Sequence, residues 1–325
     1  MRSETDWGNV MIPPMVDSAH PRMQRLAAIV ARIAATDLSV LISGETGVGK
    51  EVLAREIHAR SLRRAEPLVK INSAALPDSL IESELFGYQV GAFTGADRDR
   101  PGRVQGAHKG TLFFDEIGEL TIDAQAKLLH MLQDGEYYSL GSNETTRVDV
   151  RILAATNRDL YEEMQKGNFR EDLFYRLNVV HIEIPPLRER IQDIRRLTDH
   201  FTAVYTAQFD RPAPPVLKPE HYEALEAYRW PGNVRELENF VKSLILFNDP
   251  RSSCAQLRAR SRESTQKDTT QLSLVQMARL AGQEAERRVI EYTLRSNGWN
   301  RKRAAKVLCI SYRSLLSKIK KMEID

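Results

Sequence analysis

The 325-residue chain has little cysteine and no long hydrophobic run. Its two cysteines, Cys254 and Cys309, have no partner at the spacing of a metal-binding pair, so we expect both to be ordinary packing residues. No apolar segment approaches the ~18–20 residues of a membrane-spanning helix, and the charged N-terminus lacks the apolar core of a signal peptide. The sequence therefore predicts a cytoplasmic protein that does not contact a membrane.

Net charge is also small, at +3, but it is unevenly distributed. Residues 284–325 hold 11 Lys or Arg and 5 Asp or Glu, whereas the rest of the chain holds 36 and 39. A basic C-terminal segment beside a nearly neutral body predicts that any nucleic-acid contact lies at the C-terminus. The length fits two or three domains, and a hydrophobic content of 42% is enough for a globular core.

A glycine-rich turn lies between an apolar run, 38–42, and a segment with apolar residues on one helical face, 52–58. Glycines let a backbone approach a ligand, and the N–H groups at a helix N-terminus attract anions. We therefore predict a phosphate cradle in which Lys50 reaches the β- and γ-phosphates; the alternative is a flexible loop. Glu51 stands where Ser or Thr usually binds magnesium, so a metal ion would depend on water and on a distant Asp. The expected nucleotide contacts here are Gly44, Glu45, Thr46, Gly47, Val48, Gly49, Lys50 and Glu51.

A second apolar strand, 110–116, ends in two adjacent carboxylates, Asp115 and Glu116. In a phosphate-loop protein the first carboxylate holds the magnesium ion and the second polarises a water for attack on the γ-phosphate. The pair is common by chance, but behind Lys50 it indicates the second half of an ATPase site.

Polar side chains end two further predicted strands. Asn72 follows the strand 68–72 and either caps the next turn or lies at the sheet edge where α/β sites form. Thr156 and Asn157 follow the strand 148–155 and either report on the γ-phosphate or cap a turn.

The hexapeptide 91–96, with the sequence GAFTGA, fits neither a helix nor a strand period. It predicts a loop with one large apolar side chain, Phe93, near its tip. The residues alone leave two interpretations open. The loop is an ordinary turn with a buried Phe93, or it presents Phe93 and Thr94 to a partner.

Arginines mark two later helical segments. Arg170 and Arg176 lie in a short helix, 169–177, and are either solvated charges or arginine fingers that act on a phosphate bound by a neighbouring subunit. A helical lid is expected from 218 to 247, in which Asn233 caps a second helix and Arg235 reaches back to the nucleotide.

The C-terminal residues show a helix, a short turn and another helix, which is the helix-turn-helix pattern. Residues 297–321 carry eight Lys or Arg and no acidic residue, so the unit either enters a DNA groove or is a basic hairpin that binds no nucleic acid. The candidate DNA contacts are Arg301, Lys302, Arg303, Tyr312, Arg313, Ser314, Ser317 and Lys318.

Together these motifs resemble the central domain of bacterial enhancer-binding proteins, the AAA+ activators of sigma-54 RNA polymerase. The C-terminal unit resembles their Fis-like DNA-binding domain. The motifs are segments 44–51, 84–96, 110–116, 169–177 and 230–237, and the resemblance covers about 16–248 and 280–321. GAFTGA is the most specific of these motifs.

The resemblance implies an α/β fold, namely an AAA+ P-loop parallel sheet with a helical lid, followed by an all-α Fis-like helix-turn-helix domain. The implied boundaries are a short N-terminal segment, 1–15; an ATPase domain, 16–248, with its α/β part to about 185 and its lid at 186–248; a linker, 249–279; and a DNA-binding domain, 280–325.

The resemblance also implies residue roles, and it makes Glu51 the family's usual residue. Asn72 pairs with Glu116, Thr156 and Asn157 form sensor I, Arg235 is sensor II, and Arg170 and Arg176 act across a ring of subunits. The residues implied to contact sigma-54 are Gly91, Ala92, Phe93, Thr94, Gly95 and Ala96. In this family the loop moves with the γ-phosphate and remodels a closed promoter complex that cannot melt unaided.

The implied cofactors are ATP and Mg²⁺, and the implied partners are sigma-54 RNA polymerase holoenzyme and double-stranded DNA upstream of the promoter. The chain would form a homo-oligomeric ring, a hexamer by preference over a heptamer, at the bacterial nucleoid. Most relatives carry a sensory domain before the ATPase, but only about 15 residues precede it here. We therefore expect control by a separate regulatory protein or by expression level, unless the chain is a fragment of a longer protein.

Two other functions fit parts of the pattern. A regulator of sigma-70 promoters with a vestigial ATPase would have lost GAFTGA, which this chain retains. A general AAA+ remodeller, such as a clamp loader, is disfavoured by the Fis-like C-terminus and by the Phe93 loop.

Overall fold

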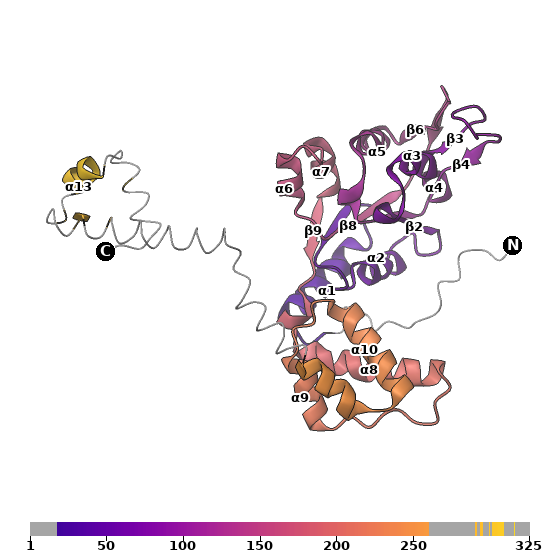
Figure 1. Cartoon of the computed structure of the whole chain (residues 1–325). Coiled ribbons are helices and arrows are strands. Elements are labelled where there is room, and N and C mark those ends of the chain that lie inside the picture. Colours follow the sequence, from indigo (N-terminus) through magenta and orange to yellow (C-terminus); the bar gives the residue numbers. More distant parts are fainter. Residues whose placement is uncertain are drawn as a thin grey trace. The chain divides into compact units, whose positions relative to one another are not determined.

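The computed structural model describes residues 18–259 and, in the C-terminal part, Ile290, Thr293, Leu294, Trp299, 301–308 and Leu315. The chain forms two compact units, Met1–Arg258 and Ala259–Asp325. The first unit contains an α/β part followed by a helical lid (Figure 1).

A five-stranded sheet, in which all strands run parallel, forms the centre of the α/β part. Its order is β2-β5-β8-β1-β9, with β1 Val40–Ser43, β2 Leu68–Asn72, β5 Thr111–Asp115, β8 Arg151–Thr156 and β9 Val180–Glu183. The registers pair Asn72 with Asp115 and Ser43 with Thr156, so the carboxyl ends of these strands lie at one edge. The polar residues that follow the strands therefore converge there.

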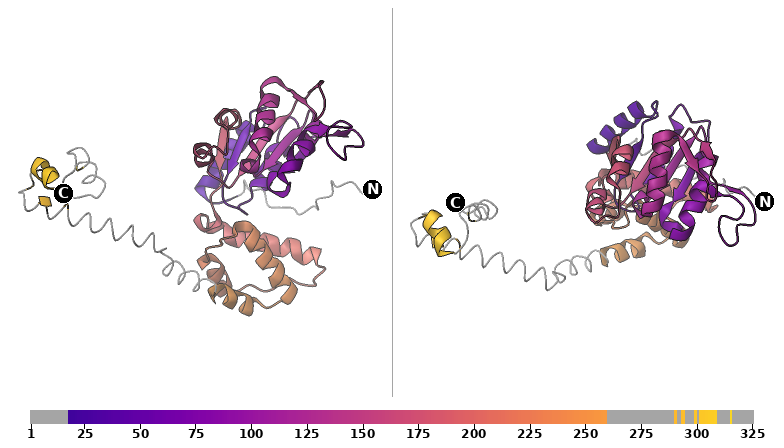
Figure 2. Two further views of the ribbon diagram at one scale, coloured as in Figure 1. Left: turned by 45° about the horizontal axis from the view of Figure 1, so that its top comes forward. Right: turned by 90° about the horizontal axis from the view of Figure 1, so that it is seen from above.

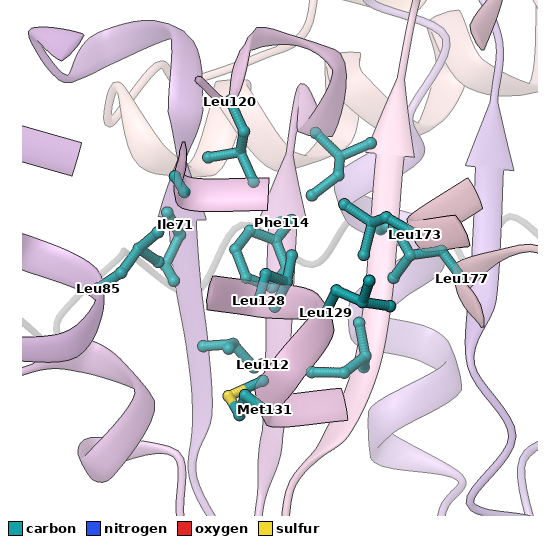
Figure 3. Close-up of a cluster of buried hydrophobic side chains, with 14 of the residues drawn as sticks. Ile71, Leu85, Leu112, Phe114, Leu120, Leu128, Leu129, Met131, Leu173 and Leu177 are labelled. Atoms are coloured by element: carbon teal, nitrogen blue, oxygen red, sulfur yellow. The ribbon is translucent and has the colours of Figure 1, made fainter. Parts of the chain in front are cut away.

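Helices cover both faces of the sheet, which explains the nearly continuous apolar runs of its strands. Helices α1 (Pro21–Ile33) and α2 (Lys50–Ala59) pack on one face with Phe113. Helices α3 (Asp78–Phe86), α5 (Ile122–Asp134) and α7 (Glu171–Leu177) pack on the other with Phe114. Figure 3 shows this second cluster, in which Phe114 lies beside Leu128 of α5.

Short elements complete the α/β part. They are η1 Ser73–Ala75, β3 Gly87–Tyr88, β4 Arg100–Pro101, α4 Arg103–Gly106, η2 Ile117–Glu119, β6 Glu136–Tyr138, β7 Thr145–Arg147 and α6 Leu160–Gln165. The residues 185–190, which we call the strap, then join β9 to the lid and include the 3-10 turn η3, Leu187–Glu189.

The lid consists of α8 (Gln192–Gln208), α9 (Pro219–Ala227) and α10 (Asn233–Phe247), which pack around the fully buried Trp230. The left view of Figure 2 shows these helices, in salmon and orange, as a helical layer of their own. Residues 250–259 are also helical, and they bury Cys254 and Leu257. Leu257 packs in the lid core, so the segment expected to be a linker from 249 begins with a helix that belongs to the lid.

In the described residues of the C-terminal unit, α13 spans Arg301–Val307. Ile290, Leu294, Ala305 and Leu315 form a small buried cluster. Among the residues that the structure describes, no helix is both long enough and apolar enough to span a bilayer.

Candidate nucleotide-binding site

The phosphate loop, residues 44–50, joins the end of β1 to the start of α2. Gly49 precedes α2 with a φ of 108°, a left-handed conformation that glycine adopts at no steric cost. Lys50 is only 6% exposed, and its Nζ donates hydrogen bonds to the carbonyls of Gly44 at 2.9 Å and Glu45 at 3.5 Å. The ammonium group is therefore held on the loop by the loop's own backbone.

The next three carbonyls of the loop accept hydrogen bonds from the strap and the lid. The Thr46 carbonyl accepts from Asn233 Nδ2 at 3.1 Å, and the Gly47 carbonyl accepts from the Arg235 N–H at 3.3 Å. The Val48 carbonyl accepts from the Arg190 guanidinium at 2.9 Å. Apart from those of Gly44 and Val48, which donate to backbone carbonyls, the loop's N–H groups are available to an anion.

Glu45 was expected among the nucleotide contacts, but its carboxylate is committed to the strap and the lid. Arg188 donates to both carboxylate oxygens, at 2.6 and 2.8 Å, and Asn233 Nδ2 donates to one of them at 3.0 Å. The Arg188 hydrogen bonds, followed by the one from Asn233, lower the pKa of Glu45 from 4.5 to about 2. Glu45 thus forms an ion pair between the phosphate loop and the strap.

Glu116 lies next to Lys50, as the two sequence motifs predicted. The Lys50 Nζ is 3.3 Å from Glu116 Oε1, and the Asn157 N–H donates to Glu116 Oε2 at 2.9 Å. Asn157 also donates from its side chain to Thr46 Oγ1 at 3.0 Å. Glu116, Lys50 and Asn157 therefore form one connected group.

The candidate metal ligand Asp115 belongs to a second charged group. Lys70 of β2 lies between two carboxylates, 3.0 Å from Asp115 Oδ2 and 2.6 Å from Glu51 Oε2. Burial raises the pKa of Glu51, but hydrogen bonds from Lys70 and Arg55 outweigh it and lower this pKa below its usual value. Glu51 is thereby held as an anion in contact with two cations.

The donor set near Asp115 fits magnesium. This ion prefers oxygen ligands and usually takes one or two carboxylates together with substrate phosphates and water. Asp115 supplies such an oxygen at the sheet edge beside the phosphate loop, and Glu51 is the second carboxylate on Lys70. Among the described residues, no three His, Cys, Asp or Glu side chains form a metal site by themselves.

Of two further expected site residues, Thr156 closes a turn, and Asn72 makes no side-chain hydrogen bond in the described part of the chain. The buried Thr156 hydroxyl accepts the Arg158 N–H at 3.0 Å and so closes the turn, which was the alternative interpretation. Asn72 is in register with Asp115 at the sheet edge, but its side chain has no hydrogen-bond partner in the described part of the chain. The implied pairing of Asn72 with Glu116 is therefore not formed in this structure, and Glu116 is bonded to Lys50 and Asn157 instead.

The three candidate arginines lie in different surroundings. Arg170 forms a two-point ion pair with Asp172, at 3.0 and 2.7 Å, and lines a surface pocket with Glu171 and Tyr175. Arg176 donates to the Leu132 carbonyl at 2.7 and 3.2 Å. The partners of these two side chains, Asp172 and the Leu132 carbonyl, belong to α7 and α5, whereas Arg235 is exposed in the first turn of α10 beside the phosphate loop.

The hexapeptide 91–96 is an exposed loop. Phe93 is 42% exposed, and its ring packs edge-on against Tyr88, with centroids 4.9 Å apart. Strand β3 pairs with β4 at the base of the loop, and the Gln89 N–H donates to the Leu140 carbonyl at 2.9 Å. The interpretation as a buried Phe is wrong, because nearly half of this side chain faces solvent near the tip of an anchored loop.

Few of the candidate DNA contacts can be located. Arg301 and Arg303 are exposed on α13. Tyr312, Arg313, Ser314, Ser317 and Lys318, and the side chain of Lys302, lie outside the described residues.

Three residues of the site had no signal in the sequence analysis: Lys70, Arg188 and Arg190. Lys70 stands in an apolar strand, where a lone lysine could have indicated a buried charge partner. Arg188 and Arg190 follow a Pro-Pro pair directly after a core strand, a position that could have indicated a rigid strap next to the nucleotide.

Three family models match the chain in succession. Residues 16–183 match the sigma-54 interaction domain, residues 188–274 match an AAA+ ATPase lid domain, and residues 283–322 match the Fis family of bacterial regulatory proteins. The lid match extends past residue 259, in agreement with the helical residues 250–259.

Curated relatives match over most of this chain. It is 42% identical to regulatory protein AtoC of Escherichia coli, over 98% of this chain and 68% of the relative. It is 50% identical to the Nif-specific regulatory protein of Azotobacter vinelandii, over 72% of this chain and 45% of the relative. The chain thus spans between about half and two thirds of the length of these relatives.

A solved structure supports the same assignment. NtrX from Brucella abortus in complex with ATP is 30% identical, with a TM-score of 0.67 over 94% of this chain and 69% of that one. The family models, the relatives and the parallel sheet with its phosphate loop all agree. The chain belongs to the sigma-54 activators, which are AAA+ ATPases that drive sigma-54-dependent transcription and carry a Fis-type DNA-binding domain.

Proposed function

We propose that this chain binds and hydrolyses ATP with Mg²⁺ as a ring of identical subunits, a hexamer by preference, and uses that energy to open a sigma-54 promoter. The observation that carries the proposal is the presence, in one compact unit, of the Lys50–Glu116–Asn157 group and of the exposed Phe93 loop. An ATPase site alone would fit many remodellers, but the loop specifies the target.

The residue roles follow from the contacts. Lys50 moves from Glu116 to the β- and γ-phosphates, because a polyphosphate offers it more negative charge than one carboxylate does. Glu116, once released, orients the attacking water, while Asn157 keeps contact with Thr46 on the loop. Asp115 would hold the magnesium ion, which when bound neutralises charge on the phosphates.

Arg170 and Arg176 are proposed to act on the nucleotide of the neighbouring subunit. They contact Asp172 of α7 and the Leu132 carbonyl of α5. A guanidinium at a subunit boundary can stabilise the charge that develops during phosphoryl transfer. A ring is therefore part of the proposed catalytic unit.

The path from nucleotide to loop runs through the sheet edge. Asn72 ends β2 in register with Asp115, and the chain continues through α3 directly into β3 and the Phe93 loop. A change at this edge can thus reach the loop through one helix. The Fis-type unit would bind DNA upstream of the promoter and hold the ring near the polymerase, in the cytoplasm at the nucleoid.

The test is ATP-dependent promoter melting. Sigma-54 holoenzyme on a supercoiled sigma-54 promoter is mixed with the full chain and ATP, and strand opening is mapped with a single-strand-specific reagent. We expect open complexes with ATP and none with a non-hydrolysable analogue or with Lys50→Ala. No melting despite measurable ATP turnover would refute this function and point to another remodelling target.

A further inference from the structure

We propose that Asn233 is a positioning residue that couples the lid to the phosphate loop, so that nucleotide affinity depends on lid orientation. The inference rests on the proposed ATP site and adds a mechanism by which the lid controls it. The Asn233 side chain is fully buried, whereas the sequence analysis expected only that it caps a helix.

Asn233, at the start of the lid helix α10, contacts two other segments, the strap and the phosphate loop. Its side chain is 0% exposed, and its Oδ1 accepts the Leu187 N–H of the strap at 2.8 Å. Its Nδ2 donates to Glu45 Oε2 at 3.0 Å and to the Thr46 carbonyl at 3.1 Å, so both amide hydrogens serve the phosphate loop. Strap, loop and lid therefore meet at one amide group.

The backbone of Asn233 supports a specific role. Its φ is 53°, a left-handed conformation that is strained for a residue with a side chain and that persists where its surroundings enforce it. The expected N-cap hydrogen bond is absent, since Gly232 is the capping position and its helix has no side-chain cap. The strained conformation points the amide at the phosphate loop rather than at its own helix.

The residues next to Asn233 also hold the lid against the phosphate loop. Two residues further on, the Arg235 N–H donates to the Gly47 carbonyl. A Cβ at Gly47 would lie 2.4 Å from the Gly232 carbonyl oxygen, so the loop and the lid approach too closely there for any side chain. The lid start and the phosphate loop thus touch along three consecutive loop residues, Glu45, Thr46 and Gly47.

Coupling follows from this geometry. A lid rotation that moves Asn233 removes the partners of the Thr46 and Gly47 carbonyls, and it displaces Arg235 at the same time. A carbonyl that loses this partner no longer holds its peptide group in place, and rotation of that peptide group reorients the adjacent N–H group that would bind phosphate. By linkage, a nucleotide that favours the present loop conformation also favours the present lid position.

The decisive variant is Asn233→Asp. Aspartate keeps the size of the side chain and the acceptor for the Leu187 N–H, but it replaces the Nδ2 donor with an oxygen that faces the Glu45 carboxylate. We expect MgADP binding, measured by calorimetry on the full chain, to weaken about tenfold or more, because a hydrogen bond is lost and two like charges meet. Asn239→Asp is the matched control, since Asn239 is exposed on the same helix, and it should bind as the wild type does.

A rescue distinguishes coupling from simple loss of packing. In Asn233→Asp with Glu45→Gln, the new amide at position 45 can donate to the carboxylate at 233, so the hydrogen bond is restored with its direction reversed. We expect the double variant to bind MgADP several-fold more tightly than it would if the affinity losses of Asn233→Asp and Glu45→Gln simply added. Asn233→Gly, which suits the positive φ but carries no amide, should lose affinity and should not be rescued by Glu45→Gln.

The possible outcomes distinguish a failure of the Asn233 coupling from a failure of the proposed ATP site. Wild-type affinity in a folded Asn233→Asp chain, or losses that simply add in the double variant, would overturn the coupling while leaving the ATP site intact. Failure of the wild-type chain to bind MgADP would overturn the ATP site and the coupling with it. If Asn233→Asp does not fold, Asn233→Gly and its lack of rescue carry the same test.

Discussion

Glu116→Gln should tighten ATP binding while it stops hydrolysis. In the structure Glu116 Oε1 lies 3.3 Å from the Lys50 Nζ, and the two side chains are only 19% and 6% exposed. Glutamine keeps the shape of the side chain and an acceptor for the Asn157 N–H, but it removes the negative charge that competes with phosphate for Lys50.

The magnitude follows from this distance. At 3.3 Å and an effective dielectric constant of about 20, the gross Coulomb attraction is about 5 kcal/mol. Desolvation of the two partly buried groups offsets most of it, so a net competition of about 1 kcal/mol is reasonable. That corresponds to about fivefold tighter ATP binding. Hydrolysis should fall by a factor of about 10²–10⁴, since a positioned general base contributes that much.

The assay is equilibrium titration of a fluorescent ATP analogue with Mg²⁺, followed by single-turnover phosphate release. Glu119→Gln is the matched control, because Glu119 is a nearby carboxylate that pairs with Arg158, at 2.5 Å, rather than with Lys50. It should change neither quantity appreciably. Equal or weaker ATP binding by Glu116→Gln would show that Glu116 does not compete for Lys50, and the electrostatic reasoning would fail.

Three further predictions test other parts of the molecule. Lys50→Ala should abolish nucleotide binding by calorimetry, because it removes the buried cation of the loop, and normal turnover in this variant would contradict the site assignment. Thr94→Ala should keep ATP turnover but lose open complexes in a promoter-melting assay; melting at the wild-type level would disprove the loop's role. The pKa of Glu45 is lowered from 4.5 to about 2 by Arg188, so its contribution to stability is complete above pH 4.5 and is lost as the pH falls toward 2. Acid denaturation should therefore show a smaller pH dependence in that window for Glu45→Gln, and an unchanged dependence would rule out the ion pair as its source.

The catalytic half of the site was predictable because its signals are local. A strand, a glycine-rich turn and a helix follow one another within residues 40–59, and the glycines and Lys50 are read directly from the sequence. Asp115 and Glu116 end a parallel strand, and parallel strands align their carboxyl ends. The motifs therefore predicted that Lys50 and the two carboxylates lie close together at the sheet edge, and this prediction did not require any information about the lid.

The contacts of the lid were not predictable in the same way. Asn233 is 188 residues from Glu45, and no local pattern shows that the two side chains meet. After Pro-Gly, an Asn at a helix start favours a cap, which is a local preference, and here a tertiary contact overrides it. The implied hydrogen bond between Asn72 and Glu116 is likewise not formed in this structure. Tertiary contacts again decide, because Glu116 is in contact with Lys50 and Asn157.

The boundary of the lid was missed because its signal is weak. Cys254 and Leu257 are three residues apart, so they lie on one face of the helical residues 250–259 and both are buried. Two large apolar side chains do not form a recognisable stripe, and the Ser, Thr, Gln and Arg content of residues 249–272 indicated a linker. Helix formation here depends on packing against the lid core, which composition does not report.

Each cation of the site named here is paired with a carboxylate of the same chain. A sequence motif identifies the charged residue but does not show this pairing. Lys50 is paired with Glu116, Lys70 with Glu51 and Asp115, and Arg188 with Glu45. A polyphosphate that enters such a site replaces internal partners rather than adding to free charges. Its affinity therefore reflects the difference between two sets of ion pairs, and each released carboxylate becomes available for a second task. Glu116 is the clearest case, since the phosphate that displaces it from Lys50 is also the group whose hydrolysis it must assist.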